Sequence, residues 1–256
     1  MKKIAALAVT PDLPLFHIGP PLDHGPLPSF FYFALSGPDS LCLDPFNQPV
    51  QFLLGLGKMI RIFSMTLPGH EANLPPENAI QLWAEDMARG TNPIGSFLDS
   101  VSTAVDFAIR ERFVDPEKMG VGGLSRGGFI ASHVAARDPR FRFLLGFAPL
   151  TRLSLLKEFS SMQEHPLVND LDAVNLSASL ADRHSKFYIG NCDARVGTRD
   201  CFDFAMSMVA AAQARKIRTP QIECVITPSI GRDGHGTSPE AFQQGALWMA
   251  QCLERP

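Results

Sequence analysis

The sequence MGVGGLSRGGF, residues 119–129, decides the fold of this chain. Its first half is apolar and glycine-rich, as expected of a buried strand, and a helical pattern over 126–137 follows Ser125. Gly123 and Gly127 flank the serine, because a serine held in a sharp strand-to-helix turn needs neighbours without side-chain bulk. The pattern predicts that Ser125 stands exposed at the end of its strand, beside the free N–H groups that begin the helix.

Apolar runs and helical patterns alternate along most of the chain. Strands are expected at 30–35, 59–67, 119–124, 143–149, 186–190 and 221–227. Helices are expected at 45–56, 76–87, 94–113, 126–137, 201–216 and 240–253. This alternation predicts an α/β fold, with a mostly parallel central sheet and helices on both faces. Right-handed crossovers bring the carboxyl ends of parallel strands to one edge, where ligands bind.

Two regions depart from the alternation. Six prolines lie within the first 28 residues and predict an irregular or edge-strand N-terminal region. Residues 150–185 combine an amphipathic stretch around 153–159 with a polar passage, and insertions after a strand often form caps over a site. We therefore expect a single α/β domain over residues 1–256, with 150–185 as a candidate cap insertion.

The composition is that of an ordinary globular protein. With 45% hydrophobic residues, 19% charged residues and a net charge of −3, the chain gives no electrostatic reason to expect nucleic acid as a partner. Five scattered cysteines without Cys-x-x-Cys spacing support neither a zinc site nor a disulfide framework. We expect reduced thiols in the cytoplasm and neither a metal nor another cofactor.

The first nine residues resemble the start of a secretory signal. Two lysines precede an apolar run of six residues, 4–9, which is too short for a signal's hydrophobic region. No apolar run approaches the roughly 18–20 residues of a membrane-spanning helix. A cytoplasmic protein without membrane association is expected, and the sequence gives no prediction of its oligomeric state.

Two further polar residues follow strands in the order that a serine nucleophile requires. A serine hydroxyl needs a base to take its proton, and the base needs an acid to orient it. Asp193 lies in GNCDARV (190–196) directly after one expected strand, and His235 lies in GRDGHG (231–236) after the next. The predicted constellation is Ser125 as nucleophile, His235 as base and Asp193 as acid.

With these motifs the chain resembles the α/β-hydrolase superfamily, and more narrowly its dienelactone-hydrolase-like and prolyl-oligopeptidase-like branches. The resemblance covers residues 30–256 and includes Leu-Pro-Gly-His-Glu at 67–71, similar to a Pro-Gly-His-Gly turn with Glu71 in place of the last glycine. It implies the α/β-hydrolase fold and a metal-independent acyl transfer through an acyl-enzyme.

The resemblance also implies an oxyanion hole made of two backbone N–H groups. One donor is expected from Arg126, the residue after the nucleophile. The other is expected from the loop after strand 30–35, where relatives often have His-Gly-x and this chain has Ser-Gly-Pro at 36–38. An alignment on the glycine places the donor at Pro38, which has no N–H, whereas a shift of one residue makes Gly37 the donor. We prefer Gly37.

Other residues offer alternatives for the same roles. His70 and His133 are candidate bases, but we expect a turn residue near the site and a helix residue respectively. Asp233 is an alternative acid for which a surface turn is favoured. Asp170 and Asp172 are further alternatives, since some relatives take the acid from the loop after the preceding strand.

Three side chains near the site receive structural interpretations. Arg195 is expected to pair with a carboxylate, with an anionic substrate group as the alternative. The side chain of Arg126 is expected to face outward, with contact to an acyl group as the alternative. Cys192 is interpreted as a small buried residue.

The function predicted from these residues is a serine hydrolase that cleaves a small carboxylic ester or thioester. A small peptidase or amidase is the alternative within enzymes. A non-catalytic binding protein on the same scaffold is the alternative outside them, motivated by Pro38 and the missing His-Gly pair.

Overall fold

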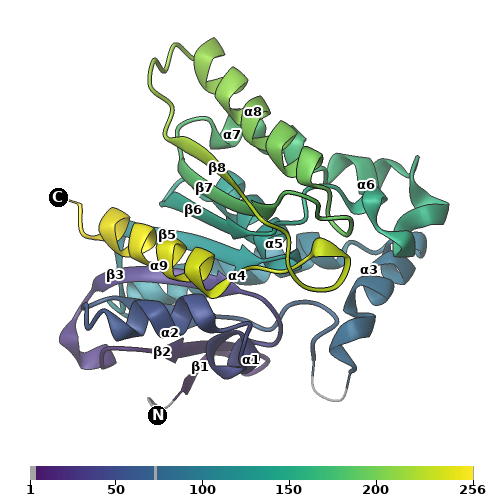
Figure 1. Ribbon diagram of the computed structural model, residues 1–256. Helices are drawn as coiled ribbons and strands as arrows, with labels where there is room; N and C mark the ends of the chain where they lie inside the picture. The colour runs from purple at the N-terminus through teal and green to yellow at the C-terminus, as the bar shows by residue number, and fades with distance from the viewer. Residues whose placement is uncertain (1–3, 72–73, 256) are drawn as a thin grey trace.

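An eight-stranded sheet forms the centre of the computed structural model, which describes residues 4–71 and 74–255 (Figure 1). The strands lie side by side in the order β1-β2-β4-β3-β5-β6-β7-β8. Strands β3 to β8 run parallel, whereas β2 is antiparallel to both β1 and β4. Their bounds are β1 Ala5–Thr10, β2 Leu13–Ile18, β3 Leu27–Phe33, β4 Arg61–Ser64, β5 Val114–Leu124, β6 Phe141–Phe147, β7 His184–Gly190 and β8 Ile222–Thr227. The predicted mostly parallel sheet is confirmed.

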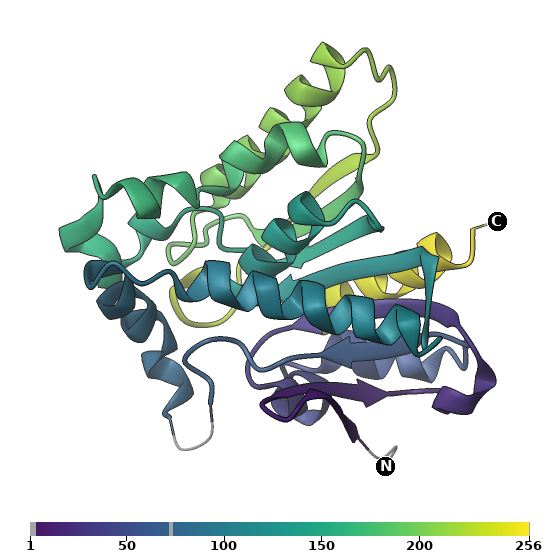
Figure 2. The same cartoon turned by 180° about the vertical axis from the view of Figure 1, so that it is seen from behind.

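Helices cover both faces of the sheet, as predicted. Helices α2 and α9 lie on the face in front in Figure 1, and α4 and α5 cover the opposite face, seen in Figure 2. The α-helices are α1 Gly37–Cys42, α2 Gln48–Gly55, α3 Ala79–Ala88, α4 Pro93–Arg110, α5 Arg126–Arg137, α6 Pro166–Asp170, α7 Ser177–Leu180, α8 Thr198–Ala214 and α9 Pro239–Leu253. No helix of the described residues is long and apolar enough to cross a membrane.

Strand β3 shows why the sheet strands read as continuous apolar runs. Phe31 and Phe33 point into the core beneath α4 and α5, while Phe30 and Tyr32 point into the core beneath α2 and α9. All four side chains are fully buried. Burial of one such side chain stabilises the fold by about 1.5–3 kcal/mol, so β3 is fixed firmly between β4 and β5.

The segment after β3 differs from the sequence prediction. Residues 36–39 were expected only to end the strand, but they begin the short helix α1. The hydroxyl of Ser36 caps this helix by accepting the N–H of Asp39 at 3.2 Å, and Pro38 occupies its first turn. The helix expected over 45–56 begins only at Gln48.

Two other boundaries differ from the prediction. Strand β5 begins at Val114, so the turn expected at 115–118 is part of the strand, with a shift of register next to Met119. Strand β2 is not at the edge of the sheet, because β1 covers it. Strand β1 lies at the edge but contains none of the N-terminal prolines, whereas Pro14 in β2 and Pro28 in β3 lie in strands inside the sheet, so the edge expected from the prolines is wrong for these two strands.

The segment expected as an insertion, 150–185, consists of short helices after β6 and ends within the first residues of β7. Together with α6 and α7 they comprise the 3₁₀ helices η3 Leu153–Leu155, η4 Lys157–Met162 and η5 Ala173–Leu176. Both views place α6 beside α3, beyond one end of the sheet (Figures 1 and 2). The loops that follow β5, β7 and β8 lie at this same end, because these strands are parallel.

Candidate active site

Ser125 occupies the sharp turn between β5 and α5. Its φ of 55° and ψ of −115° are unusual for a residue with a side chain and mark local backbone strain. Strand β6 and the segment after it brace the turn. The Ser125 N–H donates to the carbonyl of Phe147 at 2.8 Å, and the Ser125 carbonyl accepts the N–H of Leu150 at 3.1 Å.

The two glycines of the turn have the steric role expected from the sequence. A Cβ on Gly127 would lie 1.9 Å from the carbonyl oxygen of Phe33 in β3. A Cβ on Gly123 would lie 2.2 Å from the carbonyl carbon of Gly127. The first turn of α5 therefore lies directly against the end of β3, and this approach brings Ser125 close to the loop that follows β3.

The structure brings Ser125, Asp193 and His235 together, although 110 and 42 positions separate the hydrogen-bonded pairs. The Nε2 atom of His235 lies 2.8 Å from the Oγ atom of Ser125. Its Nδ1 atom lies 2.8 Å from Oδ2 of Asp193. A carboxylate accepts the Nδ1–H, which leaves the Nε2 lone pair directed at the serine hydroxyl.

The carboxylate of Asp193 is held by its own loop, between β7 and α8. Its Oδ1 atom accepts the N–H groups of Arg195 and Val196, each at 3.0 Å, so its second oxygen is left for His235. Thr198 accepts the Asp193 N–H at 2.9 Å. Asp193 is buried, and this network fixes its orientation.

A cavity of ≈ 280 Å³ opens beside Ser125 and His235. Apolar side chains supply most of its wall. It is lined by Ala34, Leu35, Pro45, Phe46, Leu124, Ser125, Arg126, Ala148, Ile230, Gly231, His235, Gly236, Thr237 and Phe242. A cavity of this size and character accommodates a small, mostly apolar group next to the serine.

The expected donors of the oxyanion hole have different surroundings. The Arg126 N–H has no acceptor within residues 4–71 and 74–255, as expected at the first position of a helix. The Gly37 N–H instead donates to the Thr66 hydroxyl at 3.0 Å, and Gly37 is absent from the lining of the cavity beside Ser125. To bind a substrate oxygen, the Gly37 N–H would have to leave Thr66.

The residues just before Gly37 offer another N–H group. Ala34 and Leu35 line the cavity, but both donate their N–H groups to the hydroxyl of the buried Ser40, at 3.1 and 2.9 Å. For Ser36, the next residue, no acceptor of the N–H lies in the described part of the chain. The sequence analysis weighed only Gly37 and Pro38 as the second donor and did not consider Ser36.

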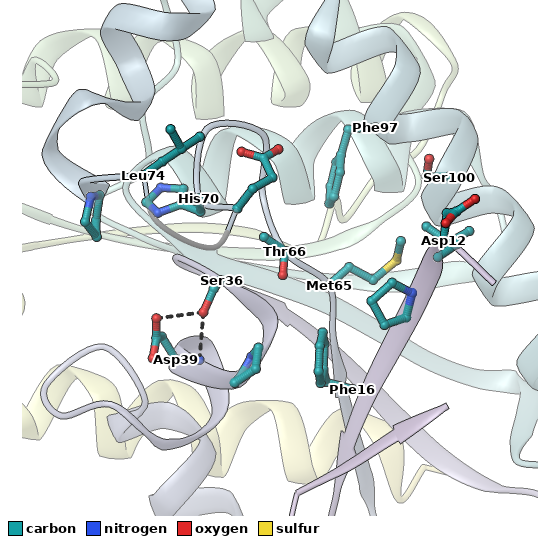
Figure 3. Close-up of a pocket in the computed structure, with 15 residues that line it drawn as sticks. Asp12, Phe16, Ser36, Asp39, Met65, Thr66, His70, Leu74, Phe97 and Ser100 are labelled. Atoms are coloured by element: carbon teal, nitrogen blue, oxygen red, sulfur yellow. Dashed lines mark hydrogen bonds between the residues drawn. The ribbon is translucent and has the colours of Figure 1, made fainter. Parts of the chain in front are cut away.

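A second, larger cavity of ≈ 640 Å³ has Ser36, Pro38 and Asp39 in its wall (Figure 3). Its walls come from the β1–β2 turn, the start of α1, the loop after β4 and helix α4. Ser36 and His70 line it, whereas Ser125 and His235 do not. Since reaction chemistry requires the hydroxyl and its base, the smaller cavity is the candidate reaction site.

The alternative bases lie in other surroundings. His70 is buried, and its Nε2 accepts a hydrogen bond from the Arg126 guanidinium at 3.0 Å. Burial, and then the charge of Arg126, lower the pKa of His70 to about 4. His133 is buried within α5 and bonds the carbonyl of Leu171 at 3.0 Å, and burial lowers its pKa to about 4 as well. The turn and helix placements expected for the two histidines agree with these contacts.

The alternative acids do not form the hydrogen bond to His235 that Asp193 forms. Asp233 and Asp170 are exposed. Asp172 pairs with Arg152 at 3.2 Å, and burial raises its pKa to about 6 despite that arginine.

Of the three structural interpretations made from the sequence, the structure agrees with one and contradicts two. Arg195 forms a two-pronged ion pair with Glu158 of η4, at 3.0 and 2.9 Å, as favoured. The interpretation of Cys192 as buried is wrong: it is exposed at the tip of the acid loop. The outward direction expected for Arg126 is also wrong, because its guanidinium is directed to His70 and to the carbonyl of Pro76.

Metal ligands do not gather anywhere in the described residues: no three histidine, cysteine, aspartate or glutamate side chains are grouped as an ion would need.

Residues 83–171, which include Ser125, match the prolyl oligopeptidase family. No protein with a curated description matches the chain. Among solved structures, TT1662 from Thermus thermophilus is similar over 100% of both chains, with 14% identity and a TM-score of 0.74. A structure described as a dienelactone hydrolase from Klebsiella pneumoniae covers 100% of this chain and 99% of its own, with 16% identity and a TM-score of 0.67.

An acylaminoacyl peptidase from Pyrococcus horikoshii is also similar, with 14% identity and a TM-score of 0.67. The similarity covers 98% of this chain but 41% of that one. The chain therefore has the α/β-hydrolase fold, and its resemblance to the dienelactone-hydrolase-like and prolyl-oligopeptidase-like branches is confirmed.

Proposed function

We propose that this protein is a serine hydrolase that cleaves a small carboxylic ester or thioester through an acyl-enzyme. The observation that carries the proposal is the pair of 2.8 Å hydrogen bonds that link Ser125 to His235 and His235 to Asp193. The strained backbone of Ser125, braced by β6, supports the assignment, because such strain often accompanies a nucleophile at a strand-to-helix turn.

The reaction proceeds in two halves. The Oγ atom of Ser125 attacks the substrate carbonyl carbon while Nε2 of His235 takes the hydroxyl proton. His235 then gives that proton to the leaving oxygen or sulfur, and an acyl-serine remains. Water, deprotonated by His235, attacks the acyl carbon; the bond to Oγ then breaks, the carboxylic acid leaves, and His235 returns the proton to Oγ of Ser125. The carboxylate of Asp193 stabilises the positive charge that His235 carries in each half.

For the oxyanion we propose the N–H groups of Arg126 and Ser36. Both lack an acceptor in the described chain. Ser36, like Gly37, is absent from the lining of the cavity beside Ser125, but it directly follows Leu35, which lines that cavity. Gly37 remains the alternative second donor, which requires that its bond to Thr66 breaks during the reaction. Removal of one such donor typically costs about 3–4 kcal/mol of transition-state stabilisation.

The size of the cavity favours a small ester over a peptide. A volume of ≈ 280 Å³ lies below the usual 300–1,000 Å³ range of ligand sites, and its wall is mostly apolar. The alternative of a peptidase or amidase draws on the match to the prolyl oligopeptidase family. We also propose that residues 150–185 act as a cap, because Glu158 of η4 pairs with Arg195 in the acid loop.

A panel of chromogenic substrates tests the proposal. Esters with acyl chains of two to eight carbons, a matching thioester and amino-acid anilides are assayed with the wild type and with Ser125→Ala. We expect a preference for short acyl chains and loss of turnover in the variant. Anilide cleavage as efficient as ester cleavage would favour the peptidase, and a folded wild type without turnover of any substrate would favour the binding protein.

A further inference from the structure

The side chain of Arg126 lies between the two cavities at the candidate active site. Its residue lines the cavity beside Ser125. Its Nη1 atom donates to Nε2 of His70 at 3.0 Å and to the carbonyl of Pro76 at 2.9 Å. Both of these acceptors line the larger cavity, where Figure 3 shows His70 on the wall.

The charge of Arg126 has no matching carboxylate. Within residues 4–71 and 74–255 it forms no ion pair, and its two acceptors, an imidazole and a carbonyl, are neutral. His70 stays neutral at pH 7 because its pKa is about 4. The neighbouring Arg195 differs, since Glu158 neutralises it through two hydrogen bonds.

Burial of this cation is costly. Burial, and then the charge of Arg195, lower the pKa of Arg126 to about 10, although Glu158 acts in the opposite direction. The guanidinium therefore remains protonated at neutral pH. A partly buried charge without a counter-ion is unfavourable, and an anion that enters the site would relieve this cost.

The geometry of the guanidinium selects the kind of anion. His70 and Pro76 occupy Nη1, whereas Nε and Nη2 have no acceptor in the described chain. Nε and Nη2 form one edge of the planar guanidinium, and that edge matches the two oxygens of a carboxylate. The remaining donors are thus arranged for a two-pronged hydrogen bond.

The larger cavity itself disfavours an anion. Asp12, Asp39 and Glu71 line it, and Figure 3 shows Asp12 and His70 on well-separated parts of its wall. The negative charges of Asp12, Asp39 and Glu71 repel an anion from the larger cavity. An anionic group would therefore bind at Arg126, next to the nucleophile.

We infer that the substrate is an anionic ester or thioester, whose carboxylate is bound by the Nε–Nη2 edge of Arg126 while Ser125 attacks its carbonyl. This inference rests on the proposed hydrolase function and adds the substrate class to it. Arg126 has two separate parts in it: its backbone N–H stabilises the oxyanion, and its side chain determines specificity.

Matched substrate pairs test the inference. The first pair is p-nitrophenyl hemiglutarate and p-nitrophenyl pentanoate, which places the carboxylate on the acyl part. The second is 4-acetoxybenzoate and 4-acetoxybenzamide, which places it on the leaving group. We expect the wild type to prefer the anionic member of one pair by about 10- to 100-fold in kcat/KM, the usual worth of a charged hydrogen-bonded pair.

Variants assign that preference to the side chain. Arg126→Gln keeps the backbone N–H and should remove the preference, and Arg126→Lys should keep part of it. The preference is the ratio of the kcat/KM values that one variant shows for the two substrates of a pair. A general loss of activity therefore cancels in this ratio. Arg199→Gln, at an exposed arginine paired with Asp203, should leave the preference unchanged. Equal kcat/KM for both members of both pairs in the wild type would overturn the inference but not the hydrolase function.

A binding measurement distinguishes a failure of the anionic-substrate inference from a failure of the proposed hydrolase function. Ser125→Ala is titrated calorimetrically with monoethyl glutarate and with diethyl glutarate, neither of which needs to react. We expect tighter binding of the anionic monoester, lost in the Ser125→Ala/Arg126→Gln double variant. Equal binding of the two esters would overturn the inference, whereas anionic preference without wild-type turnover would reject only the hydrolase.

Discussion

The two sides of the candidate active site are built in different ways. On the nucleophile side, Gly123, Ser125 and Gly127 lie within five positions, and local sterics fix their arrangement. On the opposite side, the N–H of Gly37, in the segment after β3, is bound by a side chain from a distant part of the chain, Thr66, 29 positions away. A short motif therefore encodes the first side, whereas only the folded chain defines the second.

The difference teaches where sequence patterns are informative. Small residues at Gly123 and Gly127 are required whenever a helix begins directly against β3, so the pattern alone predicts the turn. An N–H group in a loop is free or occupied according to which hydroxyl folds onto it. The occupied state of Gly37 follows from Thr66, which no local pattern connects to it.

The largest effect is expected at the acid. Asp193→Asn should lower kcat by about 10⁴-fold, because an amide no longer holds His235 in the tautomer that accepts the serine proton. Asp233→Asn is the matched control, two residues before the histidine and exposed, and should change kcat little. The two kcat values are measured by steady-state kinetics with the best ester. A large loss of kcat in Asp233→Asn together with a small one in Asp193→Asn would assign the acid to Asp233.

The opposite side of the site, which is proposed to supply the second oxyanion donor, is tested by two substitutions of Ser36. Ser36→Pro removes the N–H at a φ of −63°, which proline adopts without strain, and should lower kcat by about 10²- to 10³-fold. Ser36→Ala keeps the N–H and loses only the helix cap, so its effect on kcat should be small.

A second change separates Ser36 from Gly37. Thr66→Val frees the Gly37 N–H of its acceptor. If Ser36 is the donor, kcat should stay close to that of the wild type. A clear rise in kcat with Thr66→Val, together with an unaffected Ser36→Pro, would return the role to Gly37.

The nucleophile side is tested through stability. Gly127→Ala places a methyl group 1.9 Å from a β3 carbonyl and should lower the free energy of unfolding by about 1–3 kcal/mol through overpacking. Gly55→Ala is the control, since a Cβ there meets nothing within 4 Å. It should be neutral or slightly stabilising in urea denaturation. Equal effects of the two changes would show that the close approach of α5 to β3 is not required.

The smallest effect concerns pH, and it includes a histidine from each side. His133 behind the nucleophile and His70 behind the donor loop both have a pKa near 4, below the ordinary value of 6.5. The unfolded chain therefore binds these protons more readily, so stability is full above pH 6.5 and falls as the pH drops towards 4.

Between pH 7 and pH 5, a shift of this size corresponds to a loss of about 2 kcal/mol for each histidine. Urea denaturation at pH 7 and pH 5 measures the loss, which should be smaller in His133→Gln than in the wild type. An unchanged difference between the two pH values would show that His133 is protonated equally in the folded and unfolded protein.

Much of the site's framework was predictable from the sequence because it depends on strand order. Parallel strands put the ends of β5, β7 and β8 at one edge, and so the expected loops bring Ser125, Asp193 and His235 within hydrogen-bonding distance. Helix α1 was missed, since Ser36 and Pro38 serve equally well as strand terminators and as helix starters.

The side-chain direction of Arg126 was beyond the sequence for a different reason. A charged residue at the start of a helix ordinarily faces solvent, and only the folded loop after β4 supplies the His70 and Pro76 acceptors that draw it inward. The exposure of Cys192 likewise depends on how the acid loop lies, because its N–H bonds Ser229 from another loop.

The central claim is that Ser125 is a nucleophile activated by His235. A fluorophosphonate probe tests it most directly, with intact-mass and peptide-level mass spectrometry of the wild type, Ser125→Ala and His235→Ala. The account predicts one adduct per chain in the wild type, located on Ser125, none in Ser125→Ala and strongly slowed labelling in His235→Ala. A folded wild type that stays unlabelled, or one labelled at another residue, would contradict it.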